Sequence, residues 1–211
     1  MGSVLYFNTT PQYRLVTSGS NGSLTTGTVT VTGISGTIKL IVIPIGSGTV
    51  PGVTDSSGNV YSYTTTITAG GLYVRQAYVV NPTTTSSMTF TITSSAWSAW
   101  VGCFTVDNAI TPLLDQQNGL GSASVPSIST GPITPSFTAE LIVASAVTGI
   151  TSTGSPGAIT GYNLITLPFV AGTAQGCVIY WKSQLNIQTE NVTFAGTSMR
   201  YWAATIASYK N

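Results

Sequence analysis

Acid–base chemistry in this chain would depend on very few side chains. The 211 residues include five carboxylates and no histidine. Without an imidazole, the chain lacks the usual general base, the usual zinc ligand and the partner of a catalytic serine or cysteine. A glycosidase needs two carboxylates at a fixed separation, and only Asp107 and Asp115 lie close together in the sequence. Because they flank one loop, we interpret them as a turn acceptor and a loop-end cap, with a catalytic pair as the alternative. The sequence therefore predicts that this protein is not an enzyme.

The segment Thr54-Asp55-Ser56-Ser57-Gly58-Asn59 carries the polar side chains of a turn or of a cation-binding loop. A calcium loop of the EF-hand type needs further ligands at alternate positions and a terminal glutamate, which this segment lacks. We therefore predict a hairpin turn in which Gly58 takes a positive φ, with no metal and no other cofactor. Asp55 and Asn59 are candidate binding residues in this loop, and Asp107 is a candidate in a second loop.

Aromatic side chains are further candidates for a binding surface. Four tryptophans and ten tyrosines are available to stack on sugar rings, although such rings more often pack in a core or a subunit contact. Side chains alternate between the two faces of a strand, so Trp97 and Trp100 should point in opposite directions. Trp100 and Tyr61 are the aromatic candidates for contact with a glycan.

The two cysteines, Cys103 and Cys177, each lie in an apolar segment that is typical of a strand. Two cysteines are too few for a disulfide scaffold or a multi-ligand metal site. We predict two buried free thiols that act as small apolar side chains, with one disulfide between strands as the alternative.

Charge is scarce: 5% of the residues are charged and the net charge is +1, whereas typical globular domains are about 25% charged. So weak a field attracts neither phosphates nor anionic lipid, so we expect no nucleic-acid partner and no membrane partner. The 42% of apolar residues nevertheless supply enough surface to bury in a folded protein with a neutral, hydroxyl-rich exterior. No secretion signal and no membrane-spanning segment are visible in the sequence.

The patterned segments are short, rich in β-branched residues and bounded by Gly, Pro, Asn or Ser, which predicts an all-β fold. Residues 28–32 and 88–93 alternate between apolar residues and threonine, as half-exposed strands do. Residues 38–43 and 141–144 are almost continuously apolar, which predicts strands covered on both faces.

A set of landmarks recurs in the same order about one hundred residues later, which indicates an internal duplication. The matched landmarks are Lys39-Leu40-Ile41-Val42 with Glu140-Leu141-Ile142-Val143, Tyr61 with Tyr162, Tyr78 with Tyr180, Thr89-Phe90 with Thr193-Phe194, and Trp97 with Trp202. Each half should contain about five strands. The predicted strands lie near 38–45, 60–66, 72–80, 88–94 and 97–106 in the first half, and near 139–146, 162–169, 175–183, 191–196 and 200–209 in the second.

These patterns divide the chain into four parts. They are an N-terminal arm (1–27), a first β half (28–115), a linker rich in Gly, Ser and Pro without strands (116–136) and a second β half (137–211). The two halves form either one sandwich or two.

Four motifs occur together in this sequence: ELIV after a Thr/Pro-rich lead, VTDSSGNVYS, VDNAITPLLD after an aromatic strand, and a closing YWAATIASYK. With them, the chain resembles a group of Thr/Ser/Gly-rich β-sandwich domains found in bacteriophage virion proteins and in secreted bacterial surface proteins. The resemblance covers about residues 28–210 and departs from the group's loop pattern at Leu114, where one extra residue precedes Asp115. It implies a jelly-roll-like sandwich and brings no catalytic residues with it.

The resemblance favours a virion structural protein of a bacteriophage, such as a capsid decoration protein, a head fibre or a tail-associated module. Its partners would be other copies of itself, as a homo-oligomer, or other virion proteins. The alternative is a carbohydrate-binding or adhesive module of a secreted bacterial surface protein, extracellular or at the cell surface, whose loops at 54–61 and 107–118 hold a glycan.

Few charges also bear on assembly, because charged side chains are a common protection of exposed sheet edges. We therefore expect self-association to cover the edges of this protein. The segment 2–22 is the expected arm that reaches a neighbouring copy.

Overall fold

The computed structural model describes residues 12–23, 27–34, 37–94, 97–106, 111–123, 125–148, 158–166, 176–195 and 201–210. These residues form sixteen strands in four antiparallel sheets and include no helix, so the all-β prediction is confirmed. Nothing in this part of the chain is a helix of the length and apolarity needed to cross a membrane.

Two large sheets and two small ones make up the fold. Sheet A has the order β1 (Tyr13–Ser23), β9 (Trp97–Val106), β3 (Leu40–Ser47), β7 (Leu72–Val80) and β5 (Ser62–Tyr63), with β6 (Ile67–Ala69) also paired to β7. Sheet B consists of β2 (Gly27–Thr32), β8 (Ser87–Thr93) and β4 (Gly52–Asp55). Sheet C has the order β10 (Leu113–Ala123), β16 (Tyr201–Lys210), β12 (Glu140–Thr148), β14 (Gly176–Gln184) and β13 (Asn163–Thr166). Sheet D pairs β11 (Ser127–Ser129) with β15 (Thr193–Ala195).

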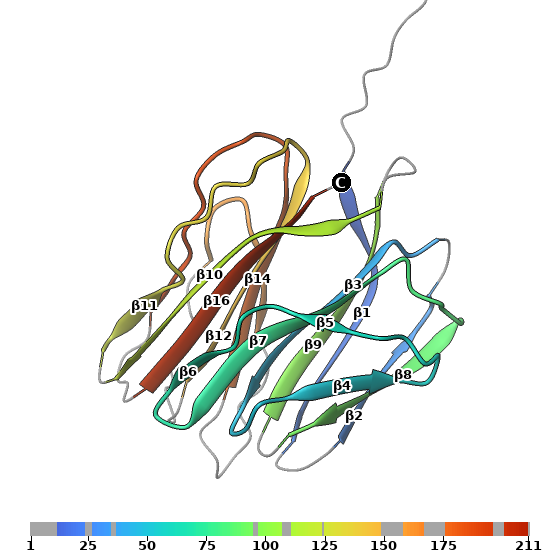
Figure 1. Cartoon of the computed structure of the whole chain (residues 1–211), viewed down its shortest axis with the longest axis horizontal. Helices are drawn as coiled ribbons and strands as arrows, with labels where there is room; N and C mark the ends of the chain where they lie inside the picture. The colour runs from blue at the N-terminus through green and yellow to red at the C-terminus, as the bar shows by residue number, and fades with distance from the viewer. Residues whose placement is uncertain are drawn as a thin grey trace, which may run out of the picture.

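The four sheets lie in layers in the order B, A, C, D (Figure 1). Apolar side chains of sheet B, among them Val29 and Phe90, pack on one face of sheet A. The other face of sheet A packs on sheet C through a second core that includes Leu40 and Tyr209. A third core, which includes Phe194, lies between sheets C and D. The molecule is thus a β-sandwich in which each large sheet is covered on both faces.

The burial of the strands follows their sequence patterns. Every residue of β3 and β12 is buried, which confirms the prediction that these apolar runs are covered on both faces. In β2 and β8 the apolar residues point inward, while the hydroxyls of Thr30 and Thr89 lie 3.4 Å apart on the other face. Full burial of a Val, Leu or Ile side chain stabilises by about 1.5–3 kcal/mol, so these runs dictate which faces come together.

A buried glutamine links the two large sheets. Gln76 on β7 is fully buried, and its Nε2 donates to the backbone carbonyl of Val143 on β12 at 2.8 Å. Its Oε1 accepts a hydrogen bond from the hydroxyl of Tyr209 on β16 at 2.9 Å. Leaving such a buried group unpaired costs about 1–3 kcal/mol, so these bonds help to fix how sheet A lies on sheet C.

Sheets A and C have the same plan. Their strands follow the chain in the same order, and the edge strands β1 and β10 each contain a register shift, between Leu15 and Thr17 and between Leu114 and Gln116. The register of the paired strands corrects one of the landmark matches made from the sequence. Tyr78 lies opposite Val42 in sheet A, and Trp181 lies opposite Val143 in sheet C. By its place in the register, Tyr78 corresponds to Trp181 and not to Tyr180, the residue with which the sequence matched it and which points to the opposite face of its strand.

The predicted arm and linker were wrong in part. Residues 13–23 of the expected arm form β1, an edge strand of sheet A, and residues 1–11 lie outside the described part of the chain. The expected strand-free linker 116–136 contains β11 and most of β10. Gly121 in this segment serves close packing, because a Cβ there would overlap the backbone carbonyl of Thr68 on β6.

Gly58 has a φ of +73°, as expected. The turn is not a hairpin, however, because β4 pairs with β8 in sheet B whereas β5 pairs with β7 in sheet A. The turn therefore carries the chain from one layer to the next.

Cys103 and Cys177 are buried free thiols, as predicted, and burial raises the pKa of each thiol to about 12.

Candidate functional site

Trp100, the predicted aromatic platform, is buried. Only 2% of its surface is exposed, and its ring lies edge-on to that of Phe104, with ring centroids 6.0 Å apart, in the core between sheets A and C. The prediction that Trp100 contacts a glycan was therefore wrong. Side chains along β9 do alternate between the two faces of sheet A. Both faces are covered, however, one by sheet B and the other by sheet C, so neither exposes Trp100.

Three other predicted residues form one cluster at the turn from β4 to β5. The Oδ2 of Asp55 accepts a hydrogen bond from the Tyr61 hydroxyl at 2.6 Å and another from Asn59 Nδ2 at 2.8 Å, while its Oδ1 accepts from the Ser57 amide at 2.8 Å. Burial alone would raise the pKa of Asp55, but the hydrogen bonds from Tyr61, Asn59 and Ser57 hold it below its ordinary value. Burial and the bond to Asp55 raise the pKa of Tyr61.

This cluster fastens loops. The Asn59 side chain exchanges two hydrogen bonds with the backbone of Thr83, at 2.9 and 2.8 Å. The Tyr61 ring is buried, with 8% of its surface exposed, so it offers no platform for a ligand. Asp55, Asn59 and Tyr61 are brought together as predicted residues of one loop, but their polar groups are occupied within the chain. Asp107 lies outside the described residues.

A second carboxylate cluster surrounds Glu190 and was not predicted. The Tyr162 hydroxyl donates to Glu190 Oε2 at 2.6 Å, and Lys182 Nζ lies 2.6 Å from Glu190 Oε1. The Lys182 ammonium also lies 4.5 Å from the centre of the Tyr162 ring. Burial would raise the pKa of Glu190, but Lys182 and Tyr162 hold it below its ordinary value. The match of Tyr61 with Tyr162 was the available signal, since each tyrosine donates to a carboxylate.

The third cluster brings together Asp115 and Glu140, from β10 and β12. Asp115 is the extra residue at the register shift of β10; its Oδ2 accepts from the Ser136 amide at 2.8 Å and its Oδ1 lies 3.4 Å from Lys210 Nζ. Glu140 Oε1 accepts from the Phe137 amide at 2.9 Å. The two carboxylates thus hold the segment 136–139, in which Ala139 has a φ of +66°, and present Phe137 to solvent. The sequence had paired Asp115 with Asp107, and Glu140 was missed as a partner because it opens an apolar strand.

The pKa values of this carboxyl pair diverge. Burial and the neighbouring Asp115 raise the pKa of Glu140, against the hydrogen bonds from Ser208 and Phe137. Burial would also raise the pKa of Asp115, but the bonds from Ser136 and the Lys210 ammonium lower it. A pair of this kind can act as acid and base only if a substrate reaches it. Glu140 has no exposed surface, so no substrate reaches it. We attribute its raised pKa to its burial beneath the segment 136–139.

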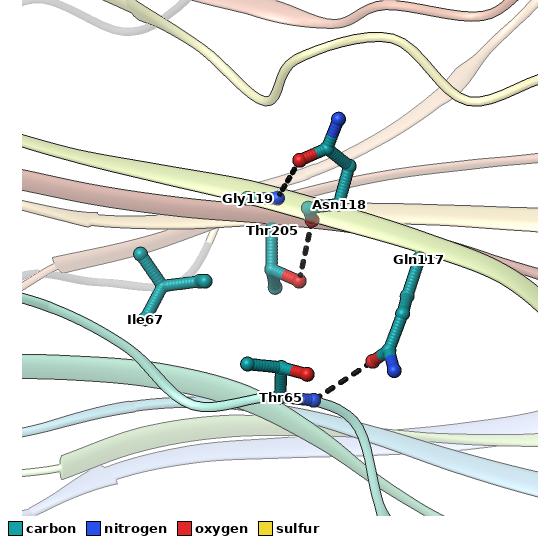
Figure 2. A pocket seen from close by; sticks show the side chains of 6 residues that line it. All are labelled: Thr65, Ile67, Gln117, Asn118, Gly119 and Thr205. Atoms are coloured by element: carbon teal, nitrogen blue, oxygen red, sulfur yellow. Dashed lines mark hydrogen bonds between the residues drawn. The ribbon is translucent and has the colours of Figure 1, made fainter.

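A small cleft lies where the two large sheets meet at one side (Figure 2). It has a volume of about 200 Å³ and is lined by Thr65, Ile67, Gln117, Asn118, Gly119 and Thr205. Figure 2 shows Gln117 reaching across to Thr65, whose amide donates to Gln117 Oε1 at 2.8 Å, while the Asn118 side chain points away. No lining residue is ionisable, so this cleft offers only neutral polar and apolar contacts. Among the described residues, no group of three or more His, Cys, Asp or Glu side chains could hold a metal ion.

Exposed apolar side chains gather at one end of sheet C. The antiparallel register places the starts of β10 and β12 and the ends of β14 and β16 at this end. Four large apolar residues lie there with 42–55% of their surface exposed: Leu113, Phe137, Leu185 and Ile187. We call these four residues the apolar end patch. Lys210 lies among them, opposite Leu113 and 4.7 Å from the centre of the Phe137 ring.

No protein-family model, no curated protein and no solved structure matches this chain.

Proposed function

We propose that this protein is a structural and binding module that acts by self-assembly, of the kind found in bacteriophage virions as capsid decoration, head fibre or tail-associated proteins. The observation that carries the proposal is the apolar end patch, because clustered exposed apolar side chains mark interaction surfaces. It contains four of the eight large apolar residues that are exposed in the described part of the chain. The location we propose is accordingly the virion.

The chemistry of the carboxylates supports a role without catalysis. All four carboxylates in the described residues accept hydrogen bonds from the chain itself, at Asp55, Asp115, Glu140 and Glu190. A general acid or base needs a side chain within reach of a substrate. Carboxylates that are already occupied in holding turns and loops are suited to a rigid building block.

We also propose that the two halves are duplicated jelly-roll-like units packed back to back. The shared strand order of sheets A and C and the shared position of the register shift support this proposal. So does the pairing of a small sheet with each large one, sheet B with A and sheet D with C. A duplicated unit is a compact way to build a particle subunit.

Edge protection gives less support to self-assembly than the sequence suggested. The outward carbonyls of Thr32 and Thr28 on β2 accept hydrogen bonds from the side chains of Thr17 and Asn21, both at 2.9 Å. The edge of β10 lies against β6, and Gln117 on β10 accepts a hydrogen bond from the Thr65 amide. Some edges are thus covered within the chain, so the proposal depends on the patch.

The alternative function, a carbohydrate-binding or adhesive module of a surface protein, has lost its aromatic platform because Trp100 and Tyr61 are buried. Among the described residues, the neutral cleft beside Gln117 is a place where a glycan could bind. We give it second rank because no aromatic ring lines the cleft.

The test is the effect of a charge in the patch on the size of the protein in solution. We expect the wild-type chain to self-associate in sedimentation velocity experiments, and Ile187→Asp to shift it toward monomer, because a carboxylate must be desolvated in an apolar contact. Val60→Asp is the matched control, since Val60 is 88% exposed and lies at the turn before β5, outside the patch. A wild-type chain that stays monomeric at millimolar concentration, and binds no particle, would contradict the proposal.

A further inference from the structure

The chain enters the sandwich at the same end as the apolar end patch. The Tyr13 amide donates to Ser183 Oγ at 3.2 Å, two residues before Leu185. The Tyr13 hydroxyl donates to the backbone carbonyl of Lys210 at 3.1 Å. Figure 1 shows the start of β1 beside the C-terminus, at the end where β10 begins. Residues 1–11 therefore precede Tyr13, which is held beside the patch by hydrogen bonds to Ser183 and to Lys210.

The sequence of this N-terminal segment is itself apolar. Val4-Leu5-Tyr6-Phe7 is an unbroken run of four apolar residues, followed by the polar spacer Asn8-Thr9-Thr10-Pro11-Gln12. Five extended residues span about 17 Å, so the spacer sets how far from Tyr13 the run can dock. Neither the run nor the spacer contains a charged residue.

We infer that the apolar end patch is the docking site for residues 4–7 of a second copy of this chain. The inference rests on the proposed self-assembly and names its partner and its contact. An apolar run gains by covering Leu113, Phe137, Leu185 and Ile187, and it needs no charge partner in a chain with so few charges. Asp115 and Glu140 contribute by holding the segment that presents Phe137. Each copy carries one run and one patch, so the contact is head to tail and can continue from copy to copy.

The test uses complementation between two full-length variants. The run variant carries Leu5→Asp and Phe7→Asp and keeps an intact patch; the patch variant carries Phe137→Asp and Ile187→Asp and keeps an intact run. We expect each variant alone to be monomeric in native mass spectrometry. A mixture should form a one-to-one complex, because the run of the patch variant can dock on the patch of the run variant. Circular dichroism checks that both variants keep the β-rich spectrum of the wild type, and Val60→Asp is the surface control.

The outcomes separate this inference from the proposed function. If the run variant assembles as well as the wild type while the patch variant does not, self-assembly through the patch stands and the named partner is wrong. If both variants are monomeric but the mixture forms no complex, docking of the run on the patch of a second copy is wrong, although assembly needs both the run and the patch. If the wild-type chain itself never associates, the proposed function and this inference both fail.

Discussion

At the scale of single residues, the few ionisable groups do structural work in pairs with polar neighbours. Asp55 and Glu190 each accept a tyrosine hydroxyl at 2.6 Å, and in both cases those bonds help keep the pKa of the carboxylate low. Glu140 differs, because it is buried beside Asp115 and its pKa is raised. The carboxylates of the described residues thus lie where a turn or loop is held, and the pKa of one of them, Glu140, is raised.

The raised pKa of Glu140 predicts a pH dependence that Glu140→Gln should remove. The unfolded residue ionises near its ordinary pKa of 4.5, while the folded residue holds its proton to higher pH. The stabilisation by this proton is complete below pH 4.5 and is lost as the pH rises through the folded pKa. A glutamine carries no such proton, so the free energy of unfolding of Glu140→Gln should fall less than that of the wild type as the pH rises, and at pH 8 it should be equal to or higher than that of the wild type.

The measurement is urea unfolding of both proteins between pH 5 and pH 8. The wild type should lose stability relative to Glu140→Gln across this range. Asp115, Asp55 and Glu190 have lowered pKa values, so their contributions are lost only as the pH falls below the ordinary range and do not interfere. Parallel stability curves for the two proteins would show that Glu140 is ionised in the folded state.

At the scale of elements, glycine in β10 reflects the close approach of another strand. A Cβ at Gly121 would overlap the carbonyl of Thr68, and a Cβ at Gly119 would overlap the side chain of Ile67. We expect Gly121→Ala to destabilise by about 1–3 kcal/mol, the usual range for overpacking. Ser122→Ala, the next residue of the same strand, is the control and should have little effect. Thermal unfolding of the two variants measures the difference, and equal stability would show that β6 and β10 separate freely.

The same strand shows where prediction from sequence ended. The apolar runs at 38–43 and 141–144 and the alternation at 28–32 and 88–93 were sufficient to place β3, β12, β2 and β8, because burial on one face or two leaves a direct trace in the sequence. β1 and β10 were missed because edge strands packed against backbone carry glycine and polar residues, which have the composition of a linker. Gly58 was placed correctly, but its local pattern contains no information on which sheet each flanking strand joins.

The candidate site was harder to predict for the same physical reason. Alternation along β9 correctly distinguishes two faces, yet it does not reveal that sheet C covers the face that bears Trp100. The Asp55, Asn59 and Tyr61 cluster was predictable as a local turn, since its residues are within six positions of one another. The apolar end patch has no local signature, because its residues come from β10 and from the segments before β12 and after β14.

At the scale of the whole molecule, assembly through the apolar end patch should be nearly independent of salt. Four apolar side chains form the patch, and Lys210, which lies beside Leu113 and Phe137, is already paired with Asp115. Between about 0.1 M and 1 M sodium chloride the Debye length falls from about 10 Å to about 3 Å, so a contact held by ion pairs would weaken strongly over this range. We expect the association constant to change by less than about threefold.

Sodium sulfate should strengthen association, because it favours the burial of apolar surface. Warming from 5 to 25 °C should also strengthen association, because the driving force for apolar burial weakens on cooling. Sedimentation equilibrium of the wild-type chain in each salt provides the measurement. A steep loss of association with sodium chloride would place charged side chains, and not the apolar end patch, at the contact between copies.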